Sequence, residues 1–145
     1  LGLALGLAPY GAWWVLIPSV DVIPTVLLSA VTLWVAGFDI LYSLQDINFD
    51  RQAGLYSIPV KFGVERSLYI ARVIHFISAL LFWYLAYAAH LPKTYIYALS
   101  PLVALLVIQH TIISSSNLKR INHAFFTANG LISIIYSAIM LLVVL

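Results

Sequence analysis

Long apolar runs separated by short polar stretches make up the pattern of hydrophobic and polar positions along the chain. The complete runs are close to the ~20 residues that a helix needs to cross the hydrocarbon core of a bilayer. The longest polar stretch covers about residues 46–66. The pattern predicts five membrane-spanning helices, at about residues 1–17, 24–45, 67–89, 94–114 and 124–145.

The composition strengthens this interpretation, because 63% of the residues are hydrophobic and only 8% are charged. A soluble domain carries about a quarter charged residues, so these charges are too few to cover a water-facing surface. Long continuous runs favour helices over the short alternating strands of a membrane β-barrel. The absence of cysteine excludes disulfides, thiolate metal sites and thiol catalysis. We therefore predict an all-α, polytopic transmembrane helical bundle that forms one domain over residues 1–145.

The basic residues predict the orientation of this bundle. If five helices alternate in direction, the loops after the second and fourth helices lie on the same side. With their flanks, these loops hold six of the seven Lys and Arg residues, and the other side holds Lys93 alone. The positive-inside rule makes the six-charge side cytoplasmic. The net charge of +2 therefore reflects topology, and we expect no nucleic-acid partner. The six residues are Arg51, Lys61, Arg66, Arg72, Lys119 and Arg120.

Polar side chains at membrane depth gather in the predicted cytoplasmic half of the helices. Ionisable groups at this depth cost several kcal/mol, and by default they face a cavity. We therefore predict a shared polar chamber with an apolar floor, suited to a ligand with a charged head and an apolar tail. The alternative is snorkelling near the helix ends, which Asp39 fits least because its side chain is short. For His75 and His110, interhelical hydrogen bonds are favoured over a cavity role. The polar set is Asp39, Tyr42, Ser43, Gln45, Asp46, Arg72, His75, Gln109, His110, Ser114, Asn122, His123 and Asn129.

The end of the second predicted helix is acidic. On one continuous helix, Asp39, Tyr42, Asp46 and Asp50 would fall within an arc of about 80°. Asp46 and Asp50 are spaced i, i+4, where two carboxylates repel each other unless a cation offsets their charge. Carboxylate oxygens on one face suit Mg²⁺, which takes one or two carboxylates and fills its other sites with water and substrate phosphate. This interpretation predicts a Mg²⁺–diphosphate site at the membrane surface.

Basic residues follow the acidic stretch directly. Arg51, Lys61 and Arg66 are candidates to bind the same diphosphate, Arg in bidentate fashion. Two plainer interpretations stay open. The aspartates could belong to a solvated helix end and pair with Arg51, and the basic residues could act only as determinants of topology.

A longer string around these residues, GFDILYSLQDINFDRQAGLYSIPVKFG at 37–63, is more specific. It resembles the second Asp-rich region of the UbiA superfamily of intramembrane prenyltransferases, especially the polyprenyltransferases that act on 4-hydroxybenzoate. The stretches LGLAPYGAWW near the start and INHAFFTANGLIS at 121–133 also resemble the family. The matching positions in the first string are Asp39, Tyr42, Asp46, Asp50, Gly54, Ser57-Ile58-Pro59 and Phe62-Gly63.

The resemblance implies a fold and an activity. The five helices would be the last five of nine, and the family's first Asp-rich motif would lie in an N-terminal half that is absent here. The 145 residues would then be inactive alone. Asp46 and Asp50 would ligate Mg²⁺ bound to a polyprenyl diphosphate, and Asp39 and Tyr42 would shape the same pocket. Ionisation of the donor would give an allylic carbocation that alkylates an aromatic acceptor, in quinone biosynthesis (ubiquinone or menaquinone) in the plasma (inner) membrane.

Two other functions compete with this one. The same chemistry on another aromatic acceptor, of a menaquinone or haem pathway, fits the residues equally well. A non-enzymatic transporter fragment would place its acidic residues near the bilayer midplane at broken helices. Here the aspartates cluster at a helix end beside a basic loop, which favours diphosphate.

Overall fold

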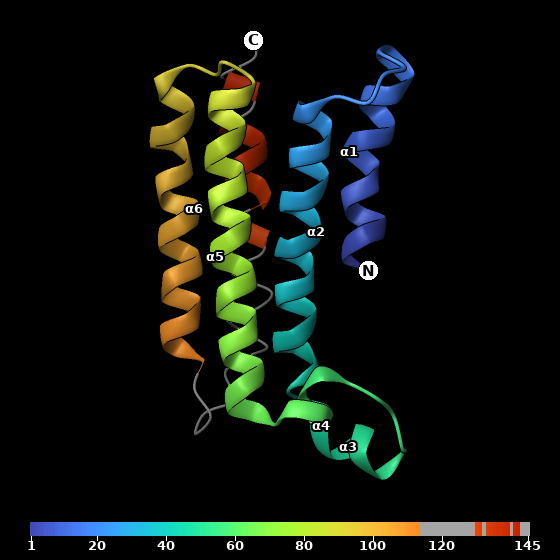
Figure 1. Cartoon of the computed structure of the whole chain (residues 1–145). Coiled ribbons are helices and arrows are strands. Elements are labelled where there is room, and N and C mark those ends of the chain that lie inside the picture. Colours follow the sequence, from blue (N-terminus) through green and yellow to red (C-terminus); the bar gives the residue numbers. More distant parts are fainter. Residues whose placement is uncertain (114–129, 132, 140, 143–145) are drawn as a thin grey trace.

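The computed structural model describes residues 1–113, 130–131, 133–139 and 141–142, and all regular structure within them is helical. Four long helices run alternately up and down, side by side (Figure 1): α1 (Gly2–Leu16), α2 (Val22–Ser43), α5 (Val64–Ala88) and α6 (Lys93–Ile112). Two short helices, α3 (Ile47–Gln52) and α4 (Ile58–Phe62), lie between α2 and α5 at one end of the bundle. The all-α prediction is confirmed.

Three of the helices, α2, α5 and α6, are long and apolar enough to cross a membrane. Their bounds agree with the predicted second, third and fourth spans to within three residues. Helix α1 is a shorter apolar helix of 15 residues. The fifth predicted span lies partly outside the described residues, as do Ser114, Lys119, Arg120, Asn122, His123 and Asn129. Three candidate spans are therefore established, and the count of five stays a prediction.

Local chemistry explains where the helices begin and end. The Asp21 carboxylate accepts a hydrogen bond from the Ile23 N–H at 3.1 Å and so caps the first turn of α2. The Ser57 hydroxyl accepts from the Val60 N–H in the same way at the start of α4. Gly63 separates α4 from α5 with a φ of 80°, a conformation that side chains with a Cβ rarely adopt. The polar stretch at about 46–66 thus contains two short helices, and α4 is the one with a side-chain cap.

Helices α1 and α2 approach each other through glycine. A Cβ on Gly2 would lie 2.5 Å from the Thr32 carbonyl oxygen, and one on Gly6 would lie 2.7 Å from the Leu28 carbonyl oxygen. Glycines four residues apart let two helix backbones come close in a bilayer, where apolar surfaces gain little from leaving lipid. The α1–α2 contact therefore depends on these two glycines.

Helix α5 packs most extensively against α2. The apolar core between them contains Phe38 and Leu41 of α2 and Leu68 and Ala71 of α5, together with Ile113 at the end of α6. Large apolar side chains elsewhere are exposed, as expected of a bundle surrounded by lipid. The acidic helix α3 therefore lies at the end of a membrane bundle and not within its core (Figure 1).

Candidate metal and diphosphate site

Asp46 and Asp50 lie one helical turn apart at the start of α3. Asp46 is the residue that caps α3, and its carbonyl accepts the Asp50 N–H at 2.8 Å. The prediction of one continuous helix face from residue 39 to residue 50 is wrong, because α2 ends at Ser43. The Asp46 N–H instead bonds the Ser43 carbonyl at 3.3 Å, in a tight turn that starts a new helix in a new direction. The break does not separate Asp46 from Asp50, which remain one helical turn apart.

The two carboxylates have no cation of their own among the described residues. Asp46 is exposed and Asp50 is half-buried. Within the described part of the chain, neither side chain forms a hydrogen bond or an ion pair, and Arg51 does not neutralise them. This disfavours the interpretation that the aspartates simply pair with Arg51. It leaves two oxygen-donor groups available at the surface.

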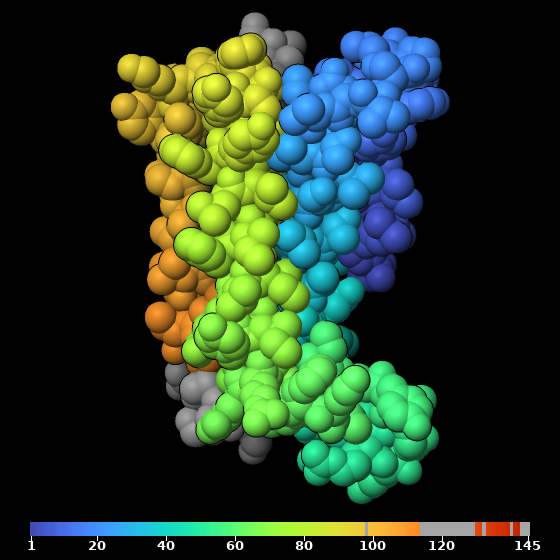
Figure 2. All heavy atoms as spheres, viewed as in Figure 1, coloured from blue at the N-terminus to red at the C-terminus, as the bar shows by residue number. Residues whose placement is uncertain are grey.

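Two of the predicted phosphate-binding residues lie on the same lobe as the aspartates. This lobe, α3 and α4, protrudes from the end of the bundle (Figure 2). Arg51 is exposed in the last turn of α3. Lys61 is exposed in α4, with its Nζ 5.3 Å from the centroid of the Phe62 ring. The lobe therefore carries both charges that a metal–diphosphate group would need.

Asp39 and Tyr42 lie one turn apart on α2, before the break. Asp39 lines a cavity of about 390 Å³ between α1, α2 and α4, together with Ser43 and Ile58. Its Oδ2 atom is 3.9 Å from the Leu1 amino nitrogen. Tyr42 is 43% exposed. These residues therefore stay at the same end of the bundle as α3, but they belong to a different helix.

His75 and His110 form the interhelical hydrogen bond that the sequence predicted. His75 Nδ1 is 2.8 Å from His110 Nε2, and His75 Nε2 is 3.1 Å from the Trp34 carbonyl oxygen. A carbonyl only accepts, so His75 Nε2 carries a hydrogen; a neutral His75 then accepts from His110. The pair joins α2, α5 and α6 and is a structural connection.

The predicted polar chamber is divided in the described residues. Asp39 and Ser43 line the cavity beside α1, whereas Arg72, His75 and His110 line another cavity of about 630 Å³ between α5 and α6. The two cavities share no residue. The described aspartates, histidines and glutamate also include no group of three or more that could hold a metal ion. Any metal bound by Asp46 and Asp50 would need further ligands from water, substrate or other residues.

Buried polar groups on α6 were only partly anticipated. Gln109 is 1% exposed, and neither its amide oxygen nor its amide nitrogen has a partner among the described residues. The sequence placed Gln109 in the predicted polar chamber, and its burial agrees with an inward-facing side chain, but its lack of a described partner was not anticipated. The close α1–α2 contact was also missed, although the spacing of Gly2 and Gly6 could have indicated it.

Together, the helices and the α3–α4 lobe define an integral membrane protein with two carboxylates at one end of its bundle that no described residue pairs with. The chain matches the UbiA prenyltransferase family over residues 1–131, and it belongs to that family. Membership implies prenyltransferase activity on a prenyl diphosphate and an acceptor, in a family that is typically Mg²⁺-dependent. No curated protein and no solved structure gave a match to the chain.

Proposed function

We propose that the protein transfers a polyprenyl group from polyprenyl diphosphate to an aromatic acceptor, 4-hydroxybenzoate, in quinone biosynthesis. Family membership supports the reaction class, and the two carboxylates at the start of α3, which no described residue pairs with, carry the site assignment. The acceptor follows from the resemblance of residues 37–63 to polyprenyltransferases that act on 4-hydroxybenzoate. The position of Asp46 and Asp50 on a lobe at the bundle end favours a diphosphate site over the transporter alternative (Figure 1).

Asp46 and Asp50 fit the ligand preference of Mg²⁺. Both are carboxylates, they lie one turn apart, and neither is engaged by a described residue. Mg²⁺ typically takes one or two carboxylates and completes its octahedron with water and phosphate oxygens, so two protein ligands suffice for part of a site. A bound Mg²⁺ would neutralise charge on the diphosphate leaving group.

The basic residues of the lobe would bind the diphosphate directly. Arg51 offers a planar pair of donors that matches two phosphate oxygens, and Lys61 offers a compact charge. Asp39 and Tyr42, on the neighbouring end of α2, would orient the reacting end of the donor or the acceptor. We propose that this end of the bundle faces the cytoplasm of the plasma (inner) membrane, because Arg51, Lys61, Arg66 and Arg72 gather there and Lys93 lies at the opposite end (Figure 1).

The test is transfer of the prenyl group from its diphosphate to 4-hydroxybenzoate by the full-length gene product in membranes. Asp46→Asn and Asp50→Asn keep side-chain size but remove the anionic ligands, so each should lower transfer roughly 10²- to 10³-fold, the equivalent of several kcal/mol. Asp21→Asn is the matched control, since Asp21 caps α2 at the opposite end and Asn preserves the cap.

The outcomes separate the hypotheses. The assignment is supported if wild-type transfer stops on addition of EDTA and returns with Mg²⁺, while the two Asn variants show little transfer under either condition. Full activity in Asp46→Asn and Asp50→Asn would remove the metal site from α3. Donor binding without product would keep the site and replace the acceptor with another aromatic compound.

A further inference from the structure

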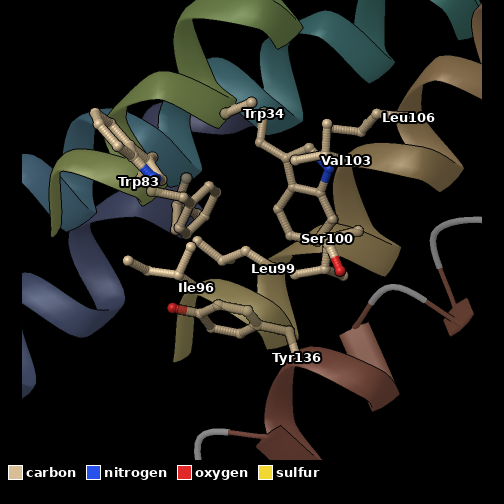
Figure 3. Close-up of a pocket in the computed structure, with 12 residues that line it drawn as sticks. Trp34, Trp83, Ile96, Leu99, Ser100, Val103, Leu106 and Tyr136 are labelled. Atoms are coloured by element: carbon tan, nitrogen blue, oxygen red, sulfur yellow. The ribbon is translucent and has the colours of Figure 1, made fainter. Parts of the chain in front are cut away.

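A groove runs between α5 and α6, and its first part is bounded on one side by α2 and by the helical residues 133–139. Its first part is a cavity of about 390 Å³, drawn in Figure 3, where Trp34 of α2 and Tyr136 face residues of α5 and α6. Its second part is the cavity of about 630 Å³ that reaches Arg72. Both parts are lined by Ala79, Val103 and Leu106, so they adjoin each other, and together they are called the α5–α6 groove.

The groove is apolar for most of its length and open to the surroundings of the bundle. Phe76 and Val107 line it and are 64% and 58% exposed, and Trp83 in the first part is 60% exposed. In a bilayer these positions face acyl chains. A hydrocarbon chain can therefore enter this groove from the side.

One end of the groove is cationic. Arg72 lines the second part, is exposed, and forms no ion pair with any described residue. Helix α5 has 25 residues, or about 37 Å at 1.5 Å per residue, and Arg72 lies only about 12 Å from its start. It therefore lies near the boundary between hydrocarbon and headgroups, where an unpaired charge is costly.

The polar side chains that line this end bond within the protein, except that His110 Nδ1 is buried without a partner among the described residues. His75 and His110 bond each other, and the Thr111 hydroxyl donates to the Ile108 carbonyl at 2.7 Å. Arg72 is thus the charged group at this end that has no ion-pair partner among the described residues, and the partner it needs is an anion. The groove beside it offers space for the apolar part of the same molecule.

We propose that the α5–α6 groove binds an anionic phospholipid, with its phosphate at Arg72 and an acyl chain along Ala79, Val103 and Leu106. A second copy of the chain would offer Arg72 little charge complementarity at this face. The chain has five acidic residues; α6 carries none of them, and α5 carries only Glu65, in its first turn. The site goes beyond the proposed transfer reaction, since the groove shares no residue with the α3–α4 lobe.

Quenching of tryptophan by brominated phospholipids tests the proposal. The full-length protein carries Trp13→Phe and Trp14→Phe, and any tryptophan beyond these 145 residues is also replaced by Phe. The remaining tryptophans are Trp34 and Trp83, which both line the groove. The vesicles contain phosphatidylcholine and phosphatidylglycerol, and only one of the two lipids is brominated in each experiment. Phosphatidylglycerol should associate with the groove about fivefold more strongly than phosphatidylcholine, the preference expected from one basic residue. This preference should fall when the ionic strength is raised.

Arg72→Gln should remove the preference, whereas Arg66→Gln should keep it, because Arg66 lies on the same helix but outside the groove. Arg72→Lys retains the charge and should retain most of the preference. Ala79→Phe should weaken quenching by both lipids, since the new ring occupies the groove. The salt dependence needs no variant and remains informative if Arg72→Gln fails to fold.

Four results would overturn the proposal. Equal quenching by the two lipids in wild type would mean ordinary solvation by the bilayer. Equal losses in Arg72→Gln and Arg66→Gln would mean a diffuse attraction to the whole basic end. Absence of quenching by either lipid would mean that protein covers the groove. Displacement of brominated phosphatidylglycerol by polyprenyl diphosphate would assign the groove to the donor. None of these readouts depends on catalysis, so failure here leaves the proposed reaction untouched.

Discussion

Helix α5 has α2 on one side and α6 on the other, and the two interfaces are built differently. Against α2, the contact is close: Gly37 makes room for the His75 ring, and the Ser78 hydroxyl donates to the Ala30 carbonyl at 2.8 Å. Against α6, a groove separates the helices over much of their length. In lipid, apolar surface alone gives helices little reason to associate. Hydrogen bonds cross both interfaces, from Ser78 to α2 and between His75 and His110 to α6, so the small residue Gly37 marks the interface that closes.

Gly37→Ala should cause the largest loss of stability. A Cβ at this position would overlap the His75 ring, which two hydrogen bonds hold in place, and overpacking of this kind costs about 3 kcal/mol at its upper end. Unfolding in mixed detergent micelles measures the change. Gly11→Ala is the control, because a Cβ there meets nothing within 4 Å. Equal stabilities of the two variants would contradict the close α2–α5 contact.

Ala71→Leu and Ala79→Leu compare the two interfaces on a single helix. Ala71 is fully buried against α2, so the added methyl groups should cost about 2 kcal/mol in the same unfolding assay. Ala79 lines the groove, where a larger side chain has room and should be neutral or slightly stabilising. The prediction fails if Ala79→Leu is the more damaging of the two.

The histidine pair should show a coupling of about 1 kcal/mol. A double-mutant cycle with His75→Leu and His110→Leu measures it, because the 2.8 Å hydrogen bond exists only when both residues are present. The same cycle between His75 and Thr111, whose hydroxyl bonds its own helix, should give a coupling near zero. Additive losses in the first cycle would show that the pair contributes packing alone.

Ser78→Ala should have the smallest measurable effect, about 0.6 kcal/mol, the average for an interhelical hydrogen bond in a membrane protein. Ser100→Ala provides the comparison, since its hydroxyl donates to the Tyr97 carbonyl of the same helix and joins no two elements. We expect no change in unfolding for Ser100→Ala. A loss that matches Ser78→Ala would mean that the cross-helix bond adds nothing specific.

Much of the fold could be predicted because apolar run length determines helix position in a membrane. The bounds of α2, α5 and α6 followed from it, and the link between His75 and His110 followed from their similar depth on adjacent helices. The break after Ser43 could not be predicted in this way. Helical periodicity continues through residues 44–46, and the turn there depends on backbone hydrogen bonds that the pattern does not reveal.

The candidate site was predicted in part for the same reason. The i, i+4 spacing of Asp46 and Asp50 is local, so it survived as one turn of α3. The single polar chamber required that side chains from separate helices meet, and this depends on helix rotation. Rotation places Asp39 beside α1 and His110 beside α5, in cavities with no residue in common.

The glycine contact of α1 has a consequence for how this helix can change through evolution. Because α1 meets α2 through bare backbone at Gly2 and Gly6, most of its side chains project away from the protein and Leu3, Leu5 and Leu7 are exposed. Nothing among the described residues packs on those outward positions, so within this part of the protein they can exchange one apolar residue for another while the docking of α1 on α2 stays fixed. Variation along α1 should therefore be restricted most strongly at two positions that carry no side chain at all.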